Sequence, residues 1–224
     1  MKKLLIIAFV STTTILNSQS DISKTIGEFS TLKVYDLISV NLVKSDENRV
    51  EISGNNSEDV EIINKNGTLK IRMTIDEVFN GNRTEVTLFY TSFDTLDTNE
   101  GAYISSSDII EHSDLELRAQ EGGQIKIKVD TKFTEIKAYT GGIINLEGTA
   151  GKVIYKVNTG GVAETKNLKV TNAEIKIRAA GVVEVNAQMI DVNIRAGGDV
   201  FIYGTPKTVK DDRVLGGRII YKEN

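Results

Sequence analysis

Hydrophobic and polar residues alternate on both sides of a series of glycine pairs in the C-terminal half of the chain. Positions three, five and seven residues before each pair are mainly apolar, and so are positions three and five after its first residue. Around one pair, Leu117 and Ala119 precede the glycines and Ile125 follows them. A period of two indicates a β-strand with one buried face. Each repeat is therefore predicted to be a strand, a glycine corner and a strand, with a short variable return such as residues 148–151 or 204–206.

The glycine corners recur at a nearly fixed interval of 17 to 21 residues. A fixed period of this length is typical of one structural unit stacked on itself, a solenoid. Glycine suits such corners because coils stack only about 4.8 Å apart and the turn favours positive φ. The corners begin at Gly101, Gly122, Gly141, Gly160, Ala180, Gly197 and Gly216.

These features predict an all-β, single-stranded parallel β-helix with coils of about 19 residues. Regular glycine-cornered coils are expected over residues 100–221. Residues 21–99 lack glycine pairs but contain β-forming runs, and they are expected to form irregular coils that continue the helix and cap its N-terminal end. The runs lie at residues 29–35, 39–43, 49–53, 69–74 and 85–90.

Two columns of charge are predicted on the outside of the solenoid. Position six before a corner is mainly acidic and position four is mainly basic, so opposite charges flank each other along a strand. One interpretation is a solvated face that neutralises itself, since each exposed pair contributes only about 0–1 kcal/mol. The other is an ionic ribbon that docks on a repeating polymer or a protein. The acidic column holds Glu116, Glu135, Ile154, Glu174 and Asp191, and the basic column holds Arg118, Lys137, Lys156, Lys176 and Asn193.

Position two before each corner offers groups that stack on sugars or hydrogen-bond to them. It holds Gln120, Tyr139, Asn158, Arg178 and Arg195. The candidate binding-face residues are therefore Arg118, Lys137, Lys156, Lys176, Tyr139, Arg178 and Arg195.

The start of the chain is typical of a secretory signal peptide, predicted over residues 1–20. Lys2 and Lys3 precede a short apolar run, and Ser18 and Ser20 are small residues at suitable cleavage positions. The mature chain is then residues 21–224, a single β-helical domain. No apolar stretch approaches the ~20 residues of a membrane-spanning helix, so no transmembrane segment is expected.

Composition narrows the function classes. The chain has 224 residues, of which 40% are hydrophobic and 26% charged, as in ordinary folding sequences. Its net charge of −4 argues against a nucleic-acid partner, which requires clustered excess Lys and Arg. Cysteine is absent, so a lipoprotein anchor is not expected. The predicted location is the periplasm, the cell surface or the extracellular space.

No catalytic constellation is found, although parallel β-helices also serve polysaccharide lyases and hydrolases. With one histidine and no cysteine, neither a catalytic triad nor a histidine-based metal site can be assembled. We therefore predict no enzymatic activity, no catalytic or metal-binding residues and no cofactor. The weak acidic and histidine candidates are Asp94, Asp97, Glu100, His112, Asp211 and Asp212.

Three segments carry a resemblance to a known family: residues 29–34 (FSTLKV), 66–71 (NGTLKI) and 197–206 (GGDVFIYGTP). With the corner repeats between them, they resemble the DUF2807 family, the GIN domain of auto-transporter adhesin heads in Bacteroidetes-type bacteria, over about residues 29–207. The family's usual corners are Ser-Gly-Ala-Gly-like, whereas these read Thr-Gly-Gly, Glu-Gly-Gly or Ala-Gly-Gly. The resemblance implies a right-handed, exported β-helix with an adhesive role, and it carries no defined catalytic residues.

Three functions remain open from the sequence. The leading hypothesis is an exported, non-enzymatic adhesin or cell-envelope interaction module whose partner is a surface polysaccharide or an envelope or host protein. The second is a carbohydrate-active protein that binds or cleaves a polysaccharide along one face of the β-helix. The third is a structural or stress-associated envelope protein with a protein partner.

Overall fold

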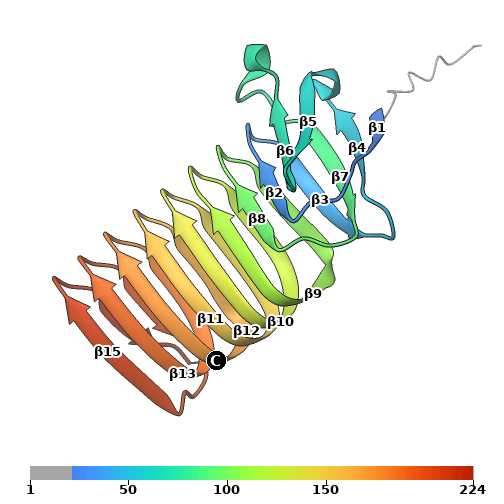
Figure 1. Ribbon diagram of the computed structural model, residues 1–224. Helices are drawn as coiled ribbons and strands as arrows, with labels where there is room; N and C mark the ends of the chain where they lie inside the picture. Colours follow the sequence, from blue (N-terminus) through green and yellow to red (C-terminus); the bar gives the residue numbers. More distant parts are fainter. Residues whose placement is uncertain (1–21, 224) are drawn as a thin grey trace, which may run out of the picture.

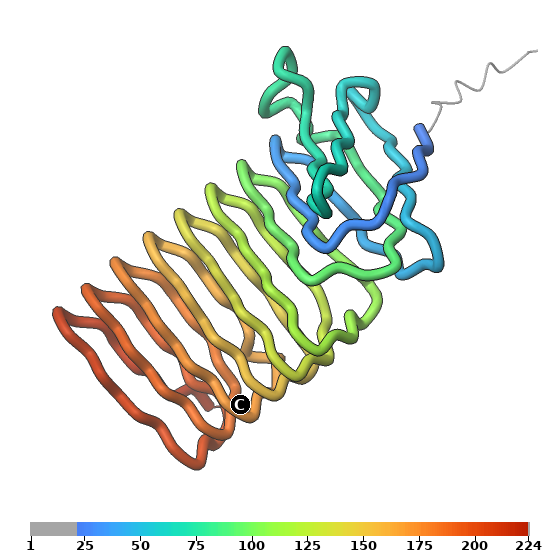
Figure 2. The backbone as a smooth tube through the Cα atoms, viewed as in Figure 1, coloured from blue at the N-terminus to red at the C-terminus, as the bar shows by residue number. Residues whose placement is uncertain are grey.

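The computed structural model describes residues 22–223. Within this range sixteen strands form one connected sheet, with two short 3-10 segments at Ser57–Asp59 and Ile75–Glu77. The sheet winds into a solenoid of about seven turns, seen in Figures 1 and 2 as a stack of coils. The predicted all-β parallel β-helix is confirmed. The predicted signal peptide, residues 1–20, lies outside the described residues.

Five long strands form the regular part of the solenoid, and each pairs in parallel with the next. Equivalent residues of successive coils are direct partners, so Ile125 lies beside Ile144 and Ile136 beside Tyr155. At the C-terminal end the coil is divided into shorter strands. The strands are β9 (Tyr103–Ala119), β10 (Gln124–Tyr139), β11 (Ile143–Asn158), β12 (Val162–Arg178), β13 (Val182–Arg195), β14 (Asp199–Ile202), β15 (Thr208–Val214) and β16 (Arg218–Tyr221).

One of the two predicted returns is a bend within a strand. Residues 148–151 lie inside β11, and the ladder continues through them with Val129 opposite Gly148. Gly148 has a φ of +109°, and a Cβ there would lie 2.1 Å from the Val129 carbonyl oxygen. The chain therefore bends while its pairing with β10 continues, and its register with β12 shifts between Asn145 and Gly148. Residues 204–206 do separate β14 from β15, as expected for Pro206, which has no N–H for a ladder.

The corner between β10 and β11 needs its two glycines for different reasons. Thr140 and Gly141 have φ values of +47° and +74°, and the Gly142 N–H donates to the Tyr139 carbonyl at 2.8 Å. This is a type I′ turn, which requires positive φ at both central residues. A Cβ on Gly142 would lie 2.0 Å from the Ala119 carbonyl oxygen of the previous coil. Gly141 is thus required by conformation and Gly142 by close packing.

Inward side chains from successive coils stack in columns that fill the solenoid. Each fully buried aliphatic side chain contributes roughly 1.5–3 kcal/mol through the hydrophobic effect. Tyr155 also lies in this core, where its hydroxyl is 2.9 Å from the Thr165 hydroxyl, so the polar group is paired. The column five residues before each corner consists of Leu117, Ile136, Tyr155, Ile175 and Val192, all fully buried.

The N-terminal region stacks its coils in an order that differs from the sequence. β2 and β3 form a coil that pairs in parallel with β8 and β9. β6 and β7 come later in the chain but pair in parallel with the other edge of β2 and β3. The chain therefore forms the coil of β2 and β3 first and then the outer coil of β6 and β7. It then crosses to the other side of the first coil, where β8 and β9 begin the regular repeats. These strands are β1 (Ile22–Thr25), β2 (Thr31–Val34), β3 (Ser39–Lys44), β4 (Arg49–Gly54), β5 (Val60–Lys65), β6 (Thr68–Met73), β7 (Thr84–Tyr90) and β8 (Thr95–Thr98).

Antiparallel strands cover this end of the solenoid. β4 pairs with β7, β1 with β4, and β5 with β6, all antiparallel. The region differs from the expected run of irregular coils over residues 21–99, since only part of it stacks in parallel. An antiparallel partner can be joined by a two-residue turn, whereas a parallel one needs a long crossover. Asn66 and Gly67, with φ values of +52° and +74°, make such a turn between β5 and β6.

Two charged residues close the C-terminal end. Asp211 is the β15 partner of Val192, and Arg213 is the partner of Ile194, so both occupy positions that are buried and hydrophobic in earlier coils. Their side chains pair with each other at 2.7 Å. Inward-pointing charges on a terminal strand hinder edge-to-edge association of β-sheets.

We expect Gly142→Ala to destabilise the protein by about 3 kcal/mol or more, because its Cβ collides with backbone of the neighbouring coil. Gly141→Ala is the matched control, since a Cβ there meets nothing within 4 Å and only the positive φ is unfavourable, at about 1–2 kcal/mol. Urea unfolding followed by circular dichroism measures both. Equal losses would contradict the steric role assigned to Gly142.

Replacing the terminal pair (Asp211→Val with Arg213→Ile) should produce concentration-dependent association, because the apolar columns then reach the open end. The control is Lys210→Val with Asp212→Val, which removes the same charges from outward positions of β15. Sedimentation velocity distinguishes the two variants. If the first stays as monodisperse as the second, the pair does not protect this end.

Candidate binding face

The second half of each coil presents outward side chains that form one surface, named here the charged face. Parallel register places Glu135 beside Glu116 and Lys137 beside Arg118. The acidic and basic columns therefore stack as the sequence register predicts. The charged face comprises the outward-facing residues of 114–120, 133–139, 152–158, 172–178 and 189–195.

Acidic and basic side chains of the two columns form a zigzag of ion pairs. Glu116 contacts Arg118 on its own strand and, at 2.8 Å, Lys137 on the next. Lys137 also contacts Glu135 at 2.7 Å, and Glu135 contacts Lys156 one coil further. Five side chains are thus linked across β9, β10 and β11. Two carboxylates thus compensate most of the charge of three cations, which supports the solvated-face interpretation.

The electrostatics of the zigzag favour the charged forms. Burial tends to raise the pKa of Glu135, but hydrogen bonds from Lys137 and Lys156 outweigh it and lower the pKa. The same balance lowers the pKa of Glu116, beside Arg118 and Lys137. Burial tends to lower the pKa of Lys137, yet its hydrogen bonds to the two glutamates raise it overall. All three groups are ionised at neutral pH.

Ile154 interrupts the zigzag. It takes the place of an acid between Glu135 and Glu174 in the column. Lys156 therefore has no acid two positions away on its own strand, and it lies directly beside Lys176 of the next coil. Lys176 contacts Glu174 at 2.6 Å. No acid of the column lies between the two lysines, so like charges adjoin at this point.

A hollow of about 310 Å³ opens beside these lysines, and we name it the cationic hollow. Three of its lining side chains are cations and none is an acid. Arg178 has no carboxylate partner among the described residues. The lining residues are Tyr139, Lys156, Val157, Asn158, Lys176 and Arg178.

Asn158 carries an unpaired polar atom in the wall of the cationic hollow. Within residues 22–223, its Oδ1 is the one buried side-chain nitrogen or oxygen without a hydrogen-bond partner. Buried polar atoms are normally paired, and an unpaired one costs about 1–3 kcal/mol. Asn158 lies between Tyr139 of the previous coil and Arg178 of the next.

The predicted binding residues are divided by their surroundings. Arg195 lies beside Arg178 but pairs with Asp212 through two contacts of 2.7 and 3.2 Å, so its charge is compensated. Arg118 and Lys137 belong to the zigzag on earlier coils. The structure brings together around one hollow Tyr139, Lys156, Lys176 and Arg178.

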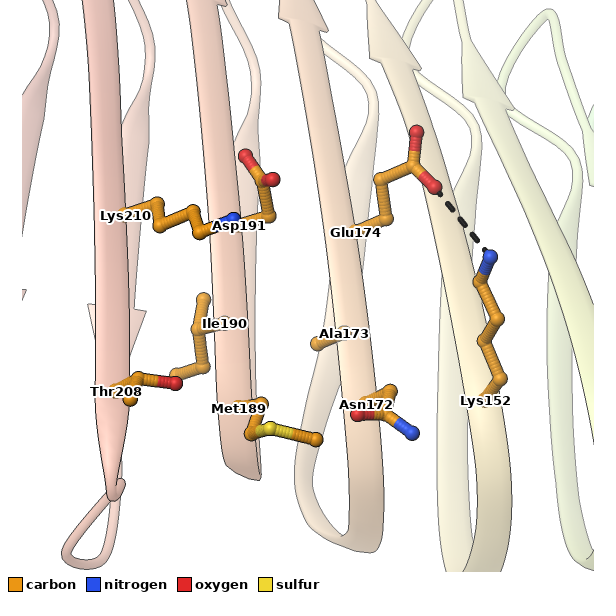
Figure 3. Close-up of a pocket in the computed structure, with 9 residues that line it drawn as sticks. All are labelled: Lys152, Asn172, Ala173, Glu174, Met189, Ile190, Asp191, Thr208 and Lys210. Carbon is orange, nitrogen blue, oxygen red and sulfur yellow. Dashed lines mark ion pairs between the residues drawn. The ribbon is translucent and has the colours of Figure 1, made fainter.

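A second hollow, of about 390 Å³, lies nearer the bends of the coils (Figure 3). Glu174 and Asp191, direct partners on β12 and β13, both line it. Lys152 lies 3.6 Å from Glu174. A hydrogen bond from Lys176 lowers the pKa of Glu174 despite the opposing effect of burial. The lining thus carries charges of both signs, and Glu174 is ionised at neutral pH.

Two residues outside the predicted candidate set shape the site. Ile154 is the one residue of the acidic column that is not an acid, and the sequence shows this directly. It indicates that the neighbouring lysines lack an intervening acid at this point. Asn158 stands in the predicted column of hydrogen-bonding residues, but its unpaired oxygen depends on three-dimensional packing that no sequence pattern reveals.

The acids weighed as catalytic candidates have structural partners. Asp94 lies 3.3 Å from His112 Nε2, while His112 Nδ1 accepts the Asp114 N–H at 3.1 Å. Asp97 pairs with Lys33 at 3.0 Å. Across residues 22–223, no group of three or more His, Cys, Asp or Glu side chains is arranged to hold a metal ion.

Glu135→Gln should lower stability by about 1 kcal/mol at neutral pH, because it removes the carboxylate shared by Lys137 and Lys156. Since the folded-state pKa of Glu135 is lowered, its contribution is present above the ordinary value of 4.5 and disappears as the pH falls through the folded-state pKa. Urea midpoints at neutral pH and at about pH 3 test this linkage. Glu147→Gln, a glutamate without a described ion pair, is the control, and a pH-independent effect of Glu135→Gln would contradict the ionic explanation.

The fold has close relatives in shape among solved structures. A putative adhesin from Bacteroides fragilis NCTC 9343 matches with a TM-score of 0.78 at 17% identity, covering 92% of this chain and 98% of that one. A putative adhesin from Parabacteroides distasonis ATCC 8503 matches with a TM-score of 0.67 at 18% identity, covering 91% and 94%. A putative lipid binding protein from the same strain gives 0.63 at 18% identity, covering 93% and 96%. At these identities the likeness establishes the fold alone.

Sequence comparison identifies the family. Among curated proteins, no sequence matches this chain. The family model described as "Putative auto-transporter adhesin, head GIN domain" matches residues 28–206, which is most of the chain and close to the range expected from the sequence motifs. The chain belongs to the DUF2807 family.

Proposed function

We propose that this protein is an exported, non-enzymatic adhesin that binds a surface polysaccharide or an envelope or host protein through its charged face. The observation that carries the proposal is the cationic hollow. It gathers three cations and an aromatic ring on a face that is otherwise largely neutralised by its own ion pairs. Membership of an adhesin-type family supports this role.

Export to the periplasm, the cell surface or the medium is part of the same proposal. The charged start, the short apolar run and the small residues at 18 and 20 support it. Among the described residues, no helix is long and apolar enough to cross a membrane.

Within the charged face we assign the contact role chiefly to Tyr139 and Arg178. The ammonium groups of Lys137, Lys156 and Lys176 already contact glutamates, so a ligand must compete with those carboxylates. Arg178 is free of that competition among the described residues. This narrows the seven candidate residues to those that line the cationic hollow.

Cleavage of a polysaccharide is the second candidate function, favoured by the paired carboxylates of Glu174 and Asp191 in the second hollow. Glycoside hydrolysis by two carboxylates requires one of them to be protonated as the general acid, usually through a raised pKa. The lowered pKa of Glu174 disfavours it for that role. Binding without cleavage is therefore the better supported function.

A lipid ligand fits the cationic hollow less well. One structural neighbour is described as a putative lipid binding protein. Here Val157 is the one aliphatic side chain in the lining, and charged and polar groups make up most of the rest. Such a lining favours a polar ligand, because burying charges against acyl chains is costly.

The purified protein should be retained by at least one member of a panel of surface polysaccharides and envelope proteins, without release of fragments. Neutralising the hollow with Lys156→Gln, Lys176→Gln and Arg178→Gln should weaken retention about ten-fold or more, because hydrogen bonds to charged groups contribute about 1.5–3 kcal/mol each. Retention and released fragments are measured in the same incubation.

The matched control is Lys126→Gln, Lys128→Gln and Lys132→Gln, which removes the same charge from exposed positions outside the charged face. Equal retention of both triple variants would show that the charged face is not the contact surface. Fragments released by the wild type but not by Glu174→Gln would replace the adhesin proposal with a cleaving enzyme.

A further inference from the structure

The cationic hollow defines what chemistry its ligand must have, and the inference drawn from it rests on the proposed function. Its lining has three cations and no acid, although the whole chain has a net charge of −4. Such a local excess on an acidic protein attracts an anionic group rather than a neutral or basic one. Glu135 and Glu174 already form ion pairs with Lys156 and Lys176. Arg178 is therefore the cation of the hollow that has no described carboxylate partner.

The guanidinium of Arg178 is matched best by a carboxylate or another planar oxyanion. Arginine donates two parallel N–H bonds to a carboxylate, a geometry that lysine cannot provide. The same chain contains such a pair one coil further, where Arg195 donates two hydrogen bonds to Asp212. Arg178 lies directly beside Arg195, but no described carboxylate pairs with Arg178.

The aromatic side chain of the hollow calls for a feature that a simple anion lacks. Tyr139 offers a flat apolar ring with a polar tip, suited to the C–H face of a pyranose. One ligand satisfies both Arg178 and Tyr139 when it combines a carboxylate with a ring that has an apolar face.

We infer that the cationic hollow binds a carboxylated sugar of an acidic polysaccharide, with Arg178 on the carboxylate and Tyr139 against the ring. Tyr139 and Arg178 lie two coils apart, and successive coils stack about 4.8 Å apart, so the two residues are separated by about 10 Å along the axis. That separation is of the order of a disaccharide. The polymer therefore lies along the solenoid axis at the hollow.

Binding of the full chain to polygalacturonate, to its methyl ester and to polyglutamate tests the inference. Polygalacturonate should bind well above both other polymers, since the ester lacks the carboxylate and polyglutamate lacks the sugar. Arg178→Gln should weaken polygalacturonate binding about ten-fold, as expected for one lost charge-assisted hydrogen-bonded contact. Lys126→Gln, with the same change in charge outside the charged face, should change it by less than about two-fold.

Arg178→Gln and Lys126→Gln remove the same charge, so a general loss of positive charge lowers polygalacturonate binding equally in the two variants. Binding equally reduced by Arg178→Gln and Lys126→Gln would overturn the assignment.

Comparison of the three polymers distinguishes the remaining outcomes. Equal binding of the methyl ester would show that the carboxylate is not recognised, and equal binding of polyglutamate would show a general anion site or an acidic protein partner. Failure to bind polygalacturonate, with the hollow triple variant still losing retention on the wider panel, would overturn the sugar class but leave the adhesin function standing.

Discussion

Parallel pairing of each coil with the next, residue on equivalent residue, is the constraint on which the rest of this structure depends. The main chains come so close at the corners that a Cβ at Gly142 would lie 2.0 Å from the carbonyl oxygen of Ala119. Once glycine permits that approach, hydrogen bonding fixes the register from β9 to β13 on either side of one local shift in each of the pairs β9–β10, β11–β12 and β12–β13. Every inward or outward position then becomes a column, because strand side chains alternate between two faces.

A single residue has a large effect where it changes a column from apolar to charged or from acidic to apolar. The two inward columns that lead to Asp211 and Arg213 consist of buried hydrophobic residues in the earlier coils, and there the paired charges end the core and hinder further stacking. At the other end, coverage is achieved by reversing chain direction, since the antiparallel hairpin of β5 and β6 needs only a two-residue turn. The C-terminal end of the solenoid is thus protected by charged side chains, and the N-terminal end by antiparallel strand pairing.

The charged face follows the same logic. Alternating Glu and Lys columns neutralise each other through shared contacts such as those of Glu135 with Lys137 and Lys156. Ile154 removes one acid from this pattern beside Lys156, and Arg178, two positions beyond Lys176 on the next coil, adds a cation without a described acid. A repeating surface thereby acquires one distinct site, and its distinctness comes from a break in the repeat rather than from an added loop.

The sequence by itself determined the strand period, the corners, the parallel register and the two charge columns, because a repeat forces equivalent residues to stack. It did not determine the N-terminal order, since strands such as β6 and β2 carry no periodic marker of which coil lies outside. Nor did it determine which cations are compensated, because contacts such as Arg195 with Asp212 join separate coils. The unpaired Asn158 oxygen likewise arises only from packing against neighbouring coils, which is a property of the folded molecule.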